Sequence, residues 1–290
     1  MSLRCRFAPS PNGLLHLGHA WSAILNHAAA RATGGTFLLR IENIDATRAR
    51  APFEAAILDD LAWLSILPPD PPRRQCEHLD AYGAALARLE ALDLIYPAFE
   101  SRAQIAAEAG RRAAAGPWPR DPDGALLYPF ARTDLPDLDR ARRRADGEPH
   151  VLRLDMRTAL AHVNGSLTWR EAQGDPLAHP VQVDADPGRW GDVILARRDV
   201  PGSYHLCVVV DDAQQAISHV IRGADLYPAT GLHRLLQALL GLPEPIYHHH
   251  RLILDEQGRK LSKSAGSPSL RHLRMAGETP GTLRRQLGLA

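Results

Sequence analysis

Hydrophobic and polar positions in the first part of the chain alternate between strand and helix spacing. Residues 4–8 predict a short strand, and the prolines and glycine of residues 9–13 exclude regular structure after it. Apolar positions from Leu17 onward recur at helical spacing until Thr33-Gly34-Gly35, a typical helix end, and residues 36–41 then predict a second strand. Strands that alternate with helices in this way indicate a parallel α/β sheet.

The same alternation continues to about residue 99. Pro52 fits the first turn of an amphipathic helix, which ends at the proline-rich residues 68–72. Residues 79–92 predict another amphipathic helix, and residues 94–99 predict a strand that closes the first half of the sheet.

Residues 100–150 differ in character from what precedes them. An alanine- and arginine-rich helix is expected over residues 103–115, followed by a stretch rich in Pro, Asp and Gly and then by a charged run. We interpret this region as an insertion within a nucleotide-binding fold. Residues 151–155 and 162–169 predict strands and turns, whereas residues 176–190 are loop-like and receive no assignment.

The second half of the sheet is expected to begin at residues 191–195. Residues 204–210 form a nearly continuous apolar run, which predicts a strand buried on both faces. Residues 217–222 predict the next strand, and a helix with Thr230 as its cap is expected to follow. The three histidines at residues 248–250 lie on a predicted strand, where alternate side chains face opposite sides, so a structural role is favoured over metal binding.

These patterns predict an α/β fold with a Rossmann-like parallel-sheet nucleotide-binding domain that is split by an insertion subdomain. The expected divisions are residues 1–96, the first half of the nucleotide-binding domain; 97–185, the insertion; 186–245, the second half; and 246–290, a lysine-bearing loop with a short helical tail.

Composition excludes several classes of protein. The chain has 290 residues, 45% of them hydrophobic, and its formal net charge is +1. No apolar run is long enough to span a membrane and no secretory signal is present, so a soluble cytoplasmic protein is expected. The three cysteines are widely spaced, which argues against disulfides and a cysteine zinc site. Two arginine clusters are either solvated helix faces or nucleic-acid contacts: Arg140, Arg142, Arg143 and Arg144, and Arg271, Arg274, Arg284 and Arg285.

Candidate phosphate-binding chemistry lies at both ends of the chain. His16, Gly18 and His19 fall at a loop-to-helix junction, where unpaired backbone N–H groups suit phosphate and a glycine permits close approach. A loop with two solvated histidines is the alternative. Lys260 and Lys263 are the only lysines in the chain, and their presence in one short loop indicates a need for a compact ammonium group, unless the loop is simply exposed and polar.

Two further charged residues lie at the carboxyl ends of predicted strands, which is the edge where open α/β sheets bind ligands. Glu42 follows the second strand and could hold an ammonium group, although acidic residues are also common in turns. Arg222 lies at the carboxyl end of the predicted strand at residues 217–222.

Two sequence motifs resemble the signatures of class I aminoacyl-tRNA synthetases. Residues 6–19 read R-F-A-P-S-P-N-G-L-L-H-L-G-H, which is similar to the glutamyl/glutaminyl branch, and residues 260–264 read K-L-S-K-S. Further similar segments follow in the same order: L-L-R-I-E-N at 38–43, Y-H-L-C-V-V-V-D-D at 204–212, and S-H-V-I-R-G-A-D at 218–225.

The resemblance implies an ATP-dependent ligase that forms glutamyl-adenylate without tRNA and uses Mg²⁺. It also implies that the split nucleotide-binding domain is the catalytic domain and that the insertion, residues 97–185, binds the acceptor. The residues that it assigns to glutamate are Arg6, Ser10, Glu42, Tyr204 and Arg222. Those that it assigns to ATP are Ala8, Pro9, His16, Gly18, His19 and Lys263. Those that it assigns to catalysis are His16, His19, Lys260 and Lys263.

The chain departs from the family in two places. Related synthetases often carry Y-P-C-x-C at the start of a zinc-binding insertion, whereas Tyr96-Pro97 is followed here by Ala98, Phe99 and Glu100, so zinc is not expected. Only residues 265–290 follow K-L-S-K-S, too few for an anticodon-binding domain. The resemblance is therefore to a short branch that transfers glutamate to the queuosine base in the anticodon loop of tRNA(Asp).

A monomer is expected. The alternatives are a minimal enzyme that charges a tRNA 3′ end, a non-catalytic tRNA-binding paralogue, and a nucleotidylyltransferase. A nucleotidylyltransferase would not require the glutamate-specific residues Glu42, Tyr204 and Arg222.

Overall fold

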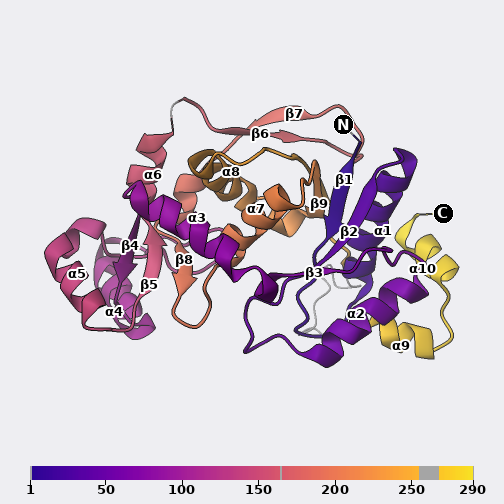
Figure 1. Cartoon of the computed structure of the whole chain (residues 1–290), viewed down its shortest axis with the longest axis horizontal. Helices are drawn as coiled ribbons and strands as arrows, with labels where there is room; N and C mark the ends of the chain where they lie inside the picture. The colour runs from indigo at the N-terminus through magenta and orange to yellow at the C-terminus, as the bar shows by residue number, and fades with distance from the viewer. Residues whose placement is uncertain (1, 164, 255–267, 290) are drawn as a thin grey trace.

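The strands in the N-terminal part of the chain form a parallel sheet, as the alternation of strand and helix patterns predicts. The computed structural model describes residues 2–163, 165–254 and 268–289. Within these residues β1 (Arg4–Phe7), β2 (Thr36–Ile41) and the short β3 (Arg73–Arg74) pair in that order, and both pairings are parallel (Figure 1). The strands predicted at residues 4–8 and 36–41 are thus confirmed.

A second sheet has the order β7-β6-β10-β9. Here β9 (His219–Gly223), β10 (Ile246–His250) and β6 (Thr168–Glu171) are parallel, and β7 (Val181–Asp184) is antiparallel to β6. β1 and β9 join the two sheets, because the Ser218 backbone N–H donates to the Arg4 carbonyl at 2.9 Å. The result is the Rossmann-like parallel α/β fold that the sequence predicts.

Helices connect these strands. Their bounds are α1 (Leu17–Ala32), α2 (Ala51–Trp63), α3 (Leu79–Ala91), α7 (Tyr204–Gln214) and α8 (Ala229–Leu240). α1, α2 and α3 agree with the predicted helices. Gly34, just after α1, adopts φ +60°, a left-handed conformation that glycine tolerates well. α8 begins after Pro228, so Thr230 lies inside its first turn and is not the predicted cap.

The largest disagreement with the sequence prediction is α7. The sequence predicts a strand at residues 204–210, but Tyr204–Gln214 is a helix whose N-cap, Ser203, accepts from the backbone N–H of Leu206. α7 is buried on nearly every side, and a helix that is apolar all round shows no amphipathic period. A continuous apolar run therefore could not distinguish a helix from a strand.

A third, antiparallel sheet holds the strand expected at residues 94–99. It consists of β4 (Ile95–Ala98), β5 (Val151–Leu154) and β8 (Ile194–Arg197), in that order. The expectation that β4 closes the first half of the parallel sheet is therefore wrong, as is the expectation that residues 191–195 begin its second half. Conversely β6, which lies within the predicted insertion, pairs with β10.

Around the antiparallel sheet lie α4 (Arg102–Arg112), α5 (Asp137–Ala145) and α6 (Met156–His162) (Figure 1). The prediction of a helix at residues 103–115 is confirmed, whereas α6 was missed. Short 3₁₀ helices complete the described chain: η1 (Gln75–Glu77), η2 (Ala113–Ala115), η3 (Arg132–Asp134), η4 (Pro187–Trp190) and η5 (Ala224–Leu226).

Arginine–aromatic stacking holds this region together. The Arg153 guanidinium lies 3.7 Å from the centre of the Tyr128 ring, and that of Arg140 lies 4.7 Å from the centre of the Tyr96 ring. Arg140 is only 5% exposed and donates to the Pro97 carbonyl, so it belongs neither to a solvated face nor to a surface patch.

The C-terminal helices α9 (Leu270–Met275) and α10 (Pro280–Leu287) pack near the first half of the sheet, with α9 against α2 (Figure 1). Leu270 and Leu283 are fully buried in the same apolar cluster as Leu15 and Ile24. No helix in the described part of the chain is long and apolar enough to cross a membrane.

Candidate active site

A cavity of ≈ 790 Å³ lies at the carboxyl ends of β1, β2, β9 and β10. Open parallel sheets bind their ligands at this edge, where the connections diverge. The cavity brings together every predicted site residue within the described chain: Arg6, Ala8, Pro9, Ser10, His16, Gly18, His19, Glu42, Tyr204 and Arg222. Lys260 and Lys263 lie outside the described residues, so their positions stay a prediction.

The two signature histidines form the start of α1. His16 is its N-cap, and its Nδ1 accepts from the Gly18 backbone N–H at 3.1 Å. His19 Nδ1 in turn accepts from the His16 backbone N–H at 3.2 Å, and the two ring centroids lie 3.9 Å apart. Since Nδ1 accepts in both rings, a neutral imidazole carries its proton on Nε2, a suitable donor for phosphate oxygens.

Gly18 has a local role that the sequence did not reveal. A Cβ at this position would lie 3.0 Å from Cε1 and 3.2 Å from Nδ1 of His16. A side chain at residue 18 would therefore displace the His16 imidazole from its capping position, in addition to narrowing the cavity.

A buried charge network lies beneath the cavity. Asp212 accepts from Arg6 Nε at 2.8 Å and from Arg40 Nη1 at 2.6 Å, and Arg40 Nη2 lies 3.3 Å from Glu42 Oε1. Arg73 binds the neighbouring Asp211 at 2.8 Å. Arg40, Asp211 and Asp212 were not among the predicted site residues, although D-D at 211–212 lies in a segment that resembles the family.

The environment of Glu42 favours binding of a cation. Burial raises the pKa of Glu42 above its usual range, although the positive charges of Arg40 and Arg6 act in the opposite direction. An ammonium group placed beside this carboxylate would favour its charged form, so binding of the cation and ionisation of the acid support each other.

Arg222 differs from the other buried arginines of the cavity. It is 5% exposed, and its hydrogen-bond acceptors among the described residues are all neutral: His249 Nε2 at 3.1 Å, His233 Nδ1 at 3.1 Å, Thr230 Oγ1 at 2.8 Å and the Leu226 carbonyl at 3.2 Å. A buried guanidinium with neutral partners attracts an anionic ligand. His233, His249 and Thr230 were not predicted to form part of the site.

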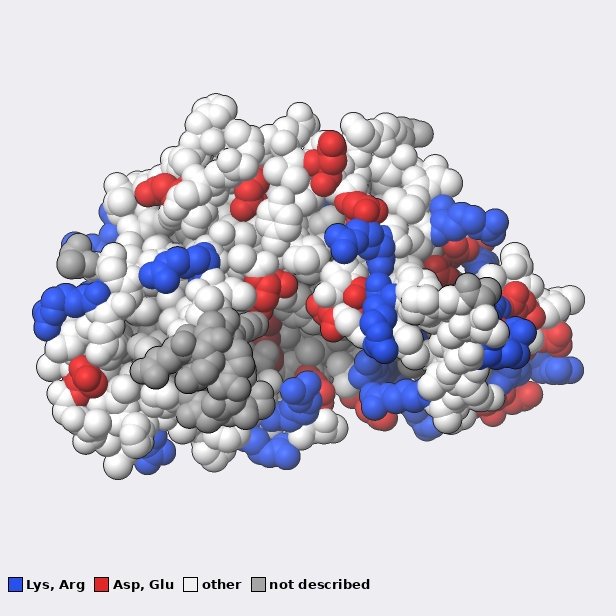
Figure 2. Space-filling model, turned by 180° about the vertical axis from the view of Figure 1, so that it is seen from behind, with Lys and Arg blue, Asp and Glu red and all other residues white. Residues whose placement is uncertain are grey.

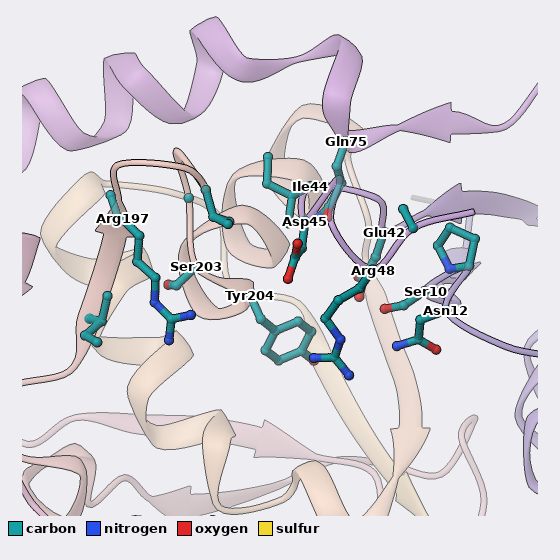
Figure 3. Close-up of a pocket in the computed structure, with 16 residues that line it drawn as sticks. Ser10, Asn12, Glu42, Ile44, Asp45, Arg48, Gln75, Arg197, Ser203 and Tyr204 are labelled. Atoms are coloured by element: carbon teal, nitrogen blue, oxygen red, sulfur yellow. The ribbon is translucent and has the colours of Figure 1, made fainter. Parts of the chain in front are cut away.

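A smaller cavity of ≈ 300 Å³ adjoins the first and shares Ser10, Glu42 and Tyr204 with it. Arg48 and Arg197 line it, and both guanidinium groups point toward the space around the Tyr204 ring (Figure 3). Arg197 lies on β8, so the antiparallel sheet supplies one wall of this second cavity. Tyr204 is at the first position of α7, and the Ser203 cap fixes its backbone.

Metal ligands and surface charge give less information about the site. Among the described residues, no group of three or more His, Cys, Asp or Glu side chains could hold a metal ion. Cys5 and Cys207 are buried and Cys76 is exposed, and all three are free. On the face shown in Figure 2, acidic and basic side chains are interspersed around a central hollow.

Comparison with known proteins agrees with this geometry. The sequence profile described as "tRNA synthetases class I (E and Q), catalytic domain" matches residues 2–289. "Glutamyl-Q tRNA(Asp) synthetase" from Rhodobacter capsulatus is 44% identical over an alignment that covers 98% of this chain and 99% of that protein. "Glutamate--tRNA ligase 2" from a Methylobacterium species is 38% identical over 96% of this chain but only 58% of that protein.

Solved structures show the same relationship. The glutamate-tRNA synthetase of Elizabethkingia anophelis matches with a TM-score of 0.75 and 27% identity, over 92% of this chain and 53% of that chain. The match over nearly the whole sequence, together with a crevice that contains the signature histidines, shows that the chain belongs to the class I tRNA synthetase family of the glutamyl and glutaminyl type, whose members are ATP-dependent ligases.

Proposed function

We propose that this protein activates glutamate with ATP and transfers it to the queuosine base in the anticodon loop of tRNA(Asp). The observation that carries the first step is Arg222, a buried guanidinium whose described partners are all neutral. The side-chain carboxylate of glutamate would supply the missing negative charge in a bidentate or single contact. Glu42 would bind the α-ammonium group, with Arg6, Ser10 and Tyr204 completing the amino-acid pocket.

Activation requires positioning rather than a protein nucleophile. An α-carboxylate oxygen of glutamate attacks the α-phosphorus of ATP, a C–O–P bond forms, the bond between the α-phosphorus and the bridging oxygen breaks, and pyrophosphate leaves. His16 and His19 would donate from Nε2 to phosphate oxygens, with Ala8, Pro9 and Gly18 beside the nucleotide. Lys260 and Lys263 are proposed to add positive charge at the phosphates.

Mg²⁺ would arrive with the ATP phosphates. The described residues offer no three-ligand cage, which fits an ion that keeps several waters and binds through phosphate oxygens. The ion would neutralise phosphate charge, whereas His16 and His19 would contribute hydrogen bonds from Nε2 to the phosphate oxygens.

The second cavity supports the transfer step. It adjoins the amino-acid pocket at Tyr204 and Glu42, so a nucleoside placed there would lie beside the activated carboxyl group. A hydroxyl of the queuosine cyclopentenediol would attack the glutamyl carbonyl and release AMP. Arg48 and Arg197 would contact the RNA backbone. The similarity to the Rhodobacter capsulatus enzyme over almost its full length favours this acceptor over others. We also propose a cytoplasmic monomer.

The decisive experiment follows labelled glutamate on purified tRNA. We expect label on 3′-blocked tRNA(Asp) that contains queuosine and none on the same tRNA without queuosine. The curated glutamate–tRNA ligases that match the chain support the alternative, a minimal enzyme that charges a 3′ end. Charging of unblocked tRNA(Glu), with no label on queuosine-containing tRNA(Asp), would establish that alternative and overturn our proposal.

A further inference from the structure

The hydrogen bonds of Arg222 determine which nitrogen of each neighbouring histidine carries the proton. An arginine can only donate, so the ring nitrogens that face it must bear lone pairs. These are Nε2 of His249, 3.1 Å from Arg222 Nε, and Nδ1 of His233, 3.1 Å from Nη1. A neutral His249 therefore carries its proton on Nδ1, and a neutral His233 on Nε2.

Each proton has an acceptor within the described structure. His249 Nδ1 lies 3.0 Å from both carboxylate oxygens of Glu171, and His233 Nε2 lies 3.1 Å from Nδ1 of His205. Glu171 also accepts from the Trp169 indole N–H and the His249 backbone N–H, each at 3.0 Å. Three donors thus converge on one buried carboxylate, which a neutral amide in its place could not satisfy.

The histidines are neutral near physiological pH. Burial, assisted by the charge of Arg222, lowers the pKa of His205 to about 4. Burial also lowers the pKa of His249 to about 4, although its hydrogen bond to Glu171 acts in the opposite direction. Burial lowers the pKa of His233 well below its usual value. The imidazoles can therefore accept from Arg222 without adding charge to the pocket.

We propose that Glu171 and His249 are positioning residues for Arg222 and make its pocket selective for a carboxylate over a carboxamide side chain. The proposal rests on the proposed function, in which Arg222 binds the side chain of the substrate. Glu171 fixes the His249 tautomer, and Nε2 then orients the guanidinium. Because an imidazole separates the Glu171 carboxylate from Arg222, the arginine is oriented without being neutralised by contact.

This arrangement contrasts with the other arginines of the site. Arg6 and Arg40 share the carboxylate of Asp212, and Arg40 also lies 3.3 Å from Glu42 and 3.7 Å from Asp211, so both arginines already have carboxylate partners within the protein. Arg222 would find its counter-ion in glutamate, whereas glutamine would leave the buried guanidinium without one. Selectivity then depends on neutral acceptors behind Arg222, and Glu171 is the residue that maintains the acceptor at His249.

The test compares Glu171→Gln with a matched control, Glu244→Gln. Glu244 accepts from the backbone N–H of Arg170, next to Glu171 on the same strand, but it does not line either cavity. We measure glutamate-dependent ATP–pyrophosphate exchange and its inhibition by glutamine. Glu171→Gln should raise the glutamate KM by about tenfold or more with kcat within about threefold, and it should reduce the preference for glutamate over glutamine by a similar factor. Glu244→Gln should change neither.

A double-variant cycle separates positioning from general packing. In a His249→Gln background the histidine tautomer no longer exists, so adding Glu171→Gln should change the glutamate KM by less than about twofold. An equal effect of Glu171→Gln in both backgrounds would overturn the proposal. Nitrogen-15 NMR of the unmodified protein provides a second measurement that needs no variant to fold. It should show His249 protonated on Nδ1, and a proton on Nε2 would also overturn the proposal.

The Arg222→Leu variant tests the proposed function separately from the positioning role of Glu171. Arg222→Leu should abolish saturation by glutamate if Arg222 binds the substrate side chain. An unchanged KM in Arg222→Leu would refute the substrate assignment and, with it, the positioning proposal. A large effect in Arg222→Leu combined with none in Glu171→Gln would refute the positioning role alone.

Discussion

Asp212 on α7 binds Arg6 on β1 through a 2.8 Å hydrogen bond between Oδ1 and Nε. The contact joins the first strand to a helix about two hundred residues later in the chain, and Arg40 completes the buried network at 2.6 Å. Removing the Asp212 charge would leave two buried guanidinium groups with too little negative charge. We expect Asp212→Asn to lower the free energy of unfolding by about 3–5 kcal/mol, measured by denaturant titration.

The control for this prediction is Glu54→Gln, which breaks a partly exposed ion pair with Arg74. It should change stability by less than about 1 kcal/mol. A comparable loss of stability in both variants would show that the buried Asp212 network contributes no more than an exposed ion pair does.

The same network predicts a pH dependence. Burial raises the pKa of Asp212, but the positive charges and hydrogen bonds of Arg6 and Arg40 lower it by more. The pKa of Asp212 therefore lies below its ordinary value of 3.8. A carboxyl group with a depressed folded-state pKa adds stability above its unfolded pKa, and this stability is lost as pH falls through the folded-state pKa. The free energy of unfolding of the parent protein should therefore decrease below about pH 4, and it should decrease less steeply in Asp212→Asn.

Two glycines provide opposite tests of packing. A Cβ on Gly202 would lie 2.5 Å from Cys207 Sγ, so Gly202→Ala must displace either the buried Cys207 side chain or the start of α7, where Ser203 and Tyr204 lie. We expect a loss of about 1–3 kcal/mol. A Cβ on Gly83, within α3, would meet no atom within 4 Å, so Gly83→Ala should stabilise the protein by up to about 1 kcal/mol. Thermal unfolding of both variants checks the two signs.

Local sequence patterns predicted the first half of the fold well, because each helix there has one apolar face and a clear end signal. They failed at α7, where burial on nearly every side removes the period that distinguishes helix from strand. They also placed β4 in the wrong sheet, since pairing between distant strands is not encoded in the spacing of either strand.

The candidate site shows the same division. Residues near a signature motif, such as His16 and Glu42, were predicted and line the crevice. Glu171, His249 and His233 were missed, because they meet Arg222 only after β6, β9, β10 and α8 come together. The one signal in the sequence was the run of three histidines, whose alternation on β10 places His249 on the opposite side from its neighbours.

The loop that carries Lys260 and Lys263 lies outside the described residues, so its role remains a prediction from the sequence. Lys263→Ala should slow glutamate-dependent ATP–pyrophosphate exchange by about 10²- to 10³-fold, the effect of losing one donor to the transition state. Arg142→Ala removes a cation from the exposed side of α5 and serves as the control. Exchange at the parental rate in Lys263→Ala would exclude a catalytic role for this lysine.

The segment after Tyr96 lacks the thiolates of a zinc knuckle, and stacking such as that of Arg153 on Tyr128 is found in their place. We therefore predict that the purified protein contains no stoichiometric zinc and that a chelator leaves its thermal midpoint unchanged. One zinc per chain by elemental analysis would contradict this prediction and indicate ligands other than cysteine.

The two cavities are expected to serve different steps, adenylate formation in the crevice at the strand ends and glutamate transfer in the smaller cavity. Arg197 lines the smaller cavity but not the crevice at the strand ends, so it should be unnecessary for adenylate formation. If the acceptor nucleoside enters the smaller cavity, the Arg197 guanidinium would bind the RNA backbone there. Arg197→Ala should leave pyrophosphate exchange within about twofold of the parent and reduce glutamate transfer to tRNA by about tenfold, with a weaker salt dependence.

Arg198→Ala is the matched control, because Arg198 is the adjacent exposed arginine and lines neither cavity. It removes the same charge from nearly the same place and should affect transfer much less than Arg197→Ala does. An equal loss in both variants would mean that the transfer step responds to overall positive charge, because a specific contact in the cavity distinguishes the two arginines whereas long-range attraction does not.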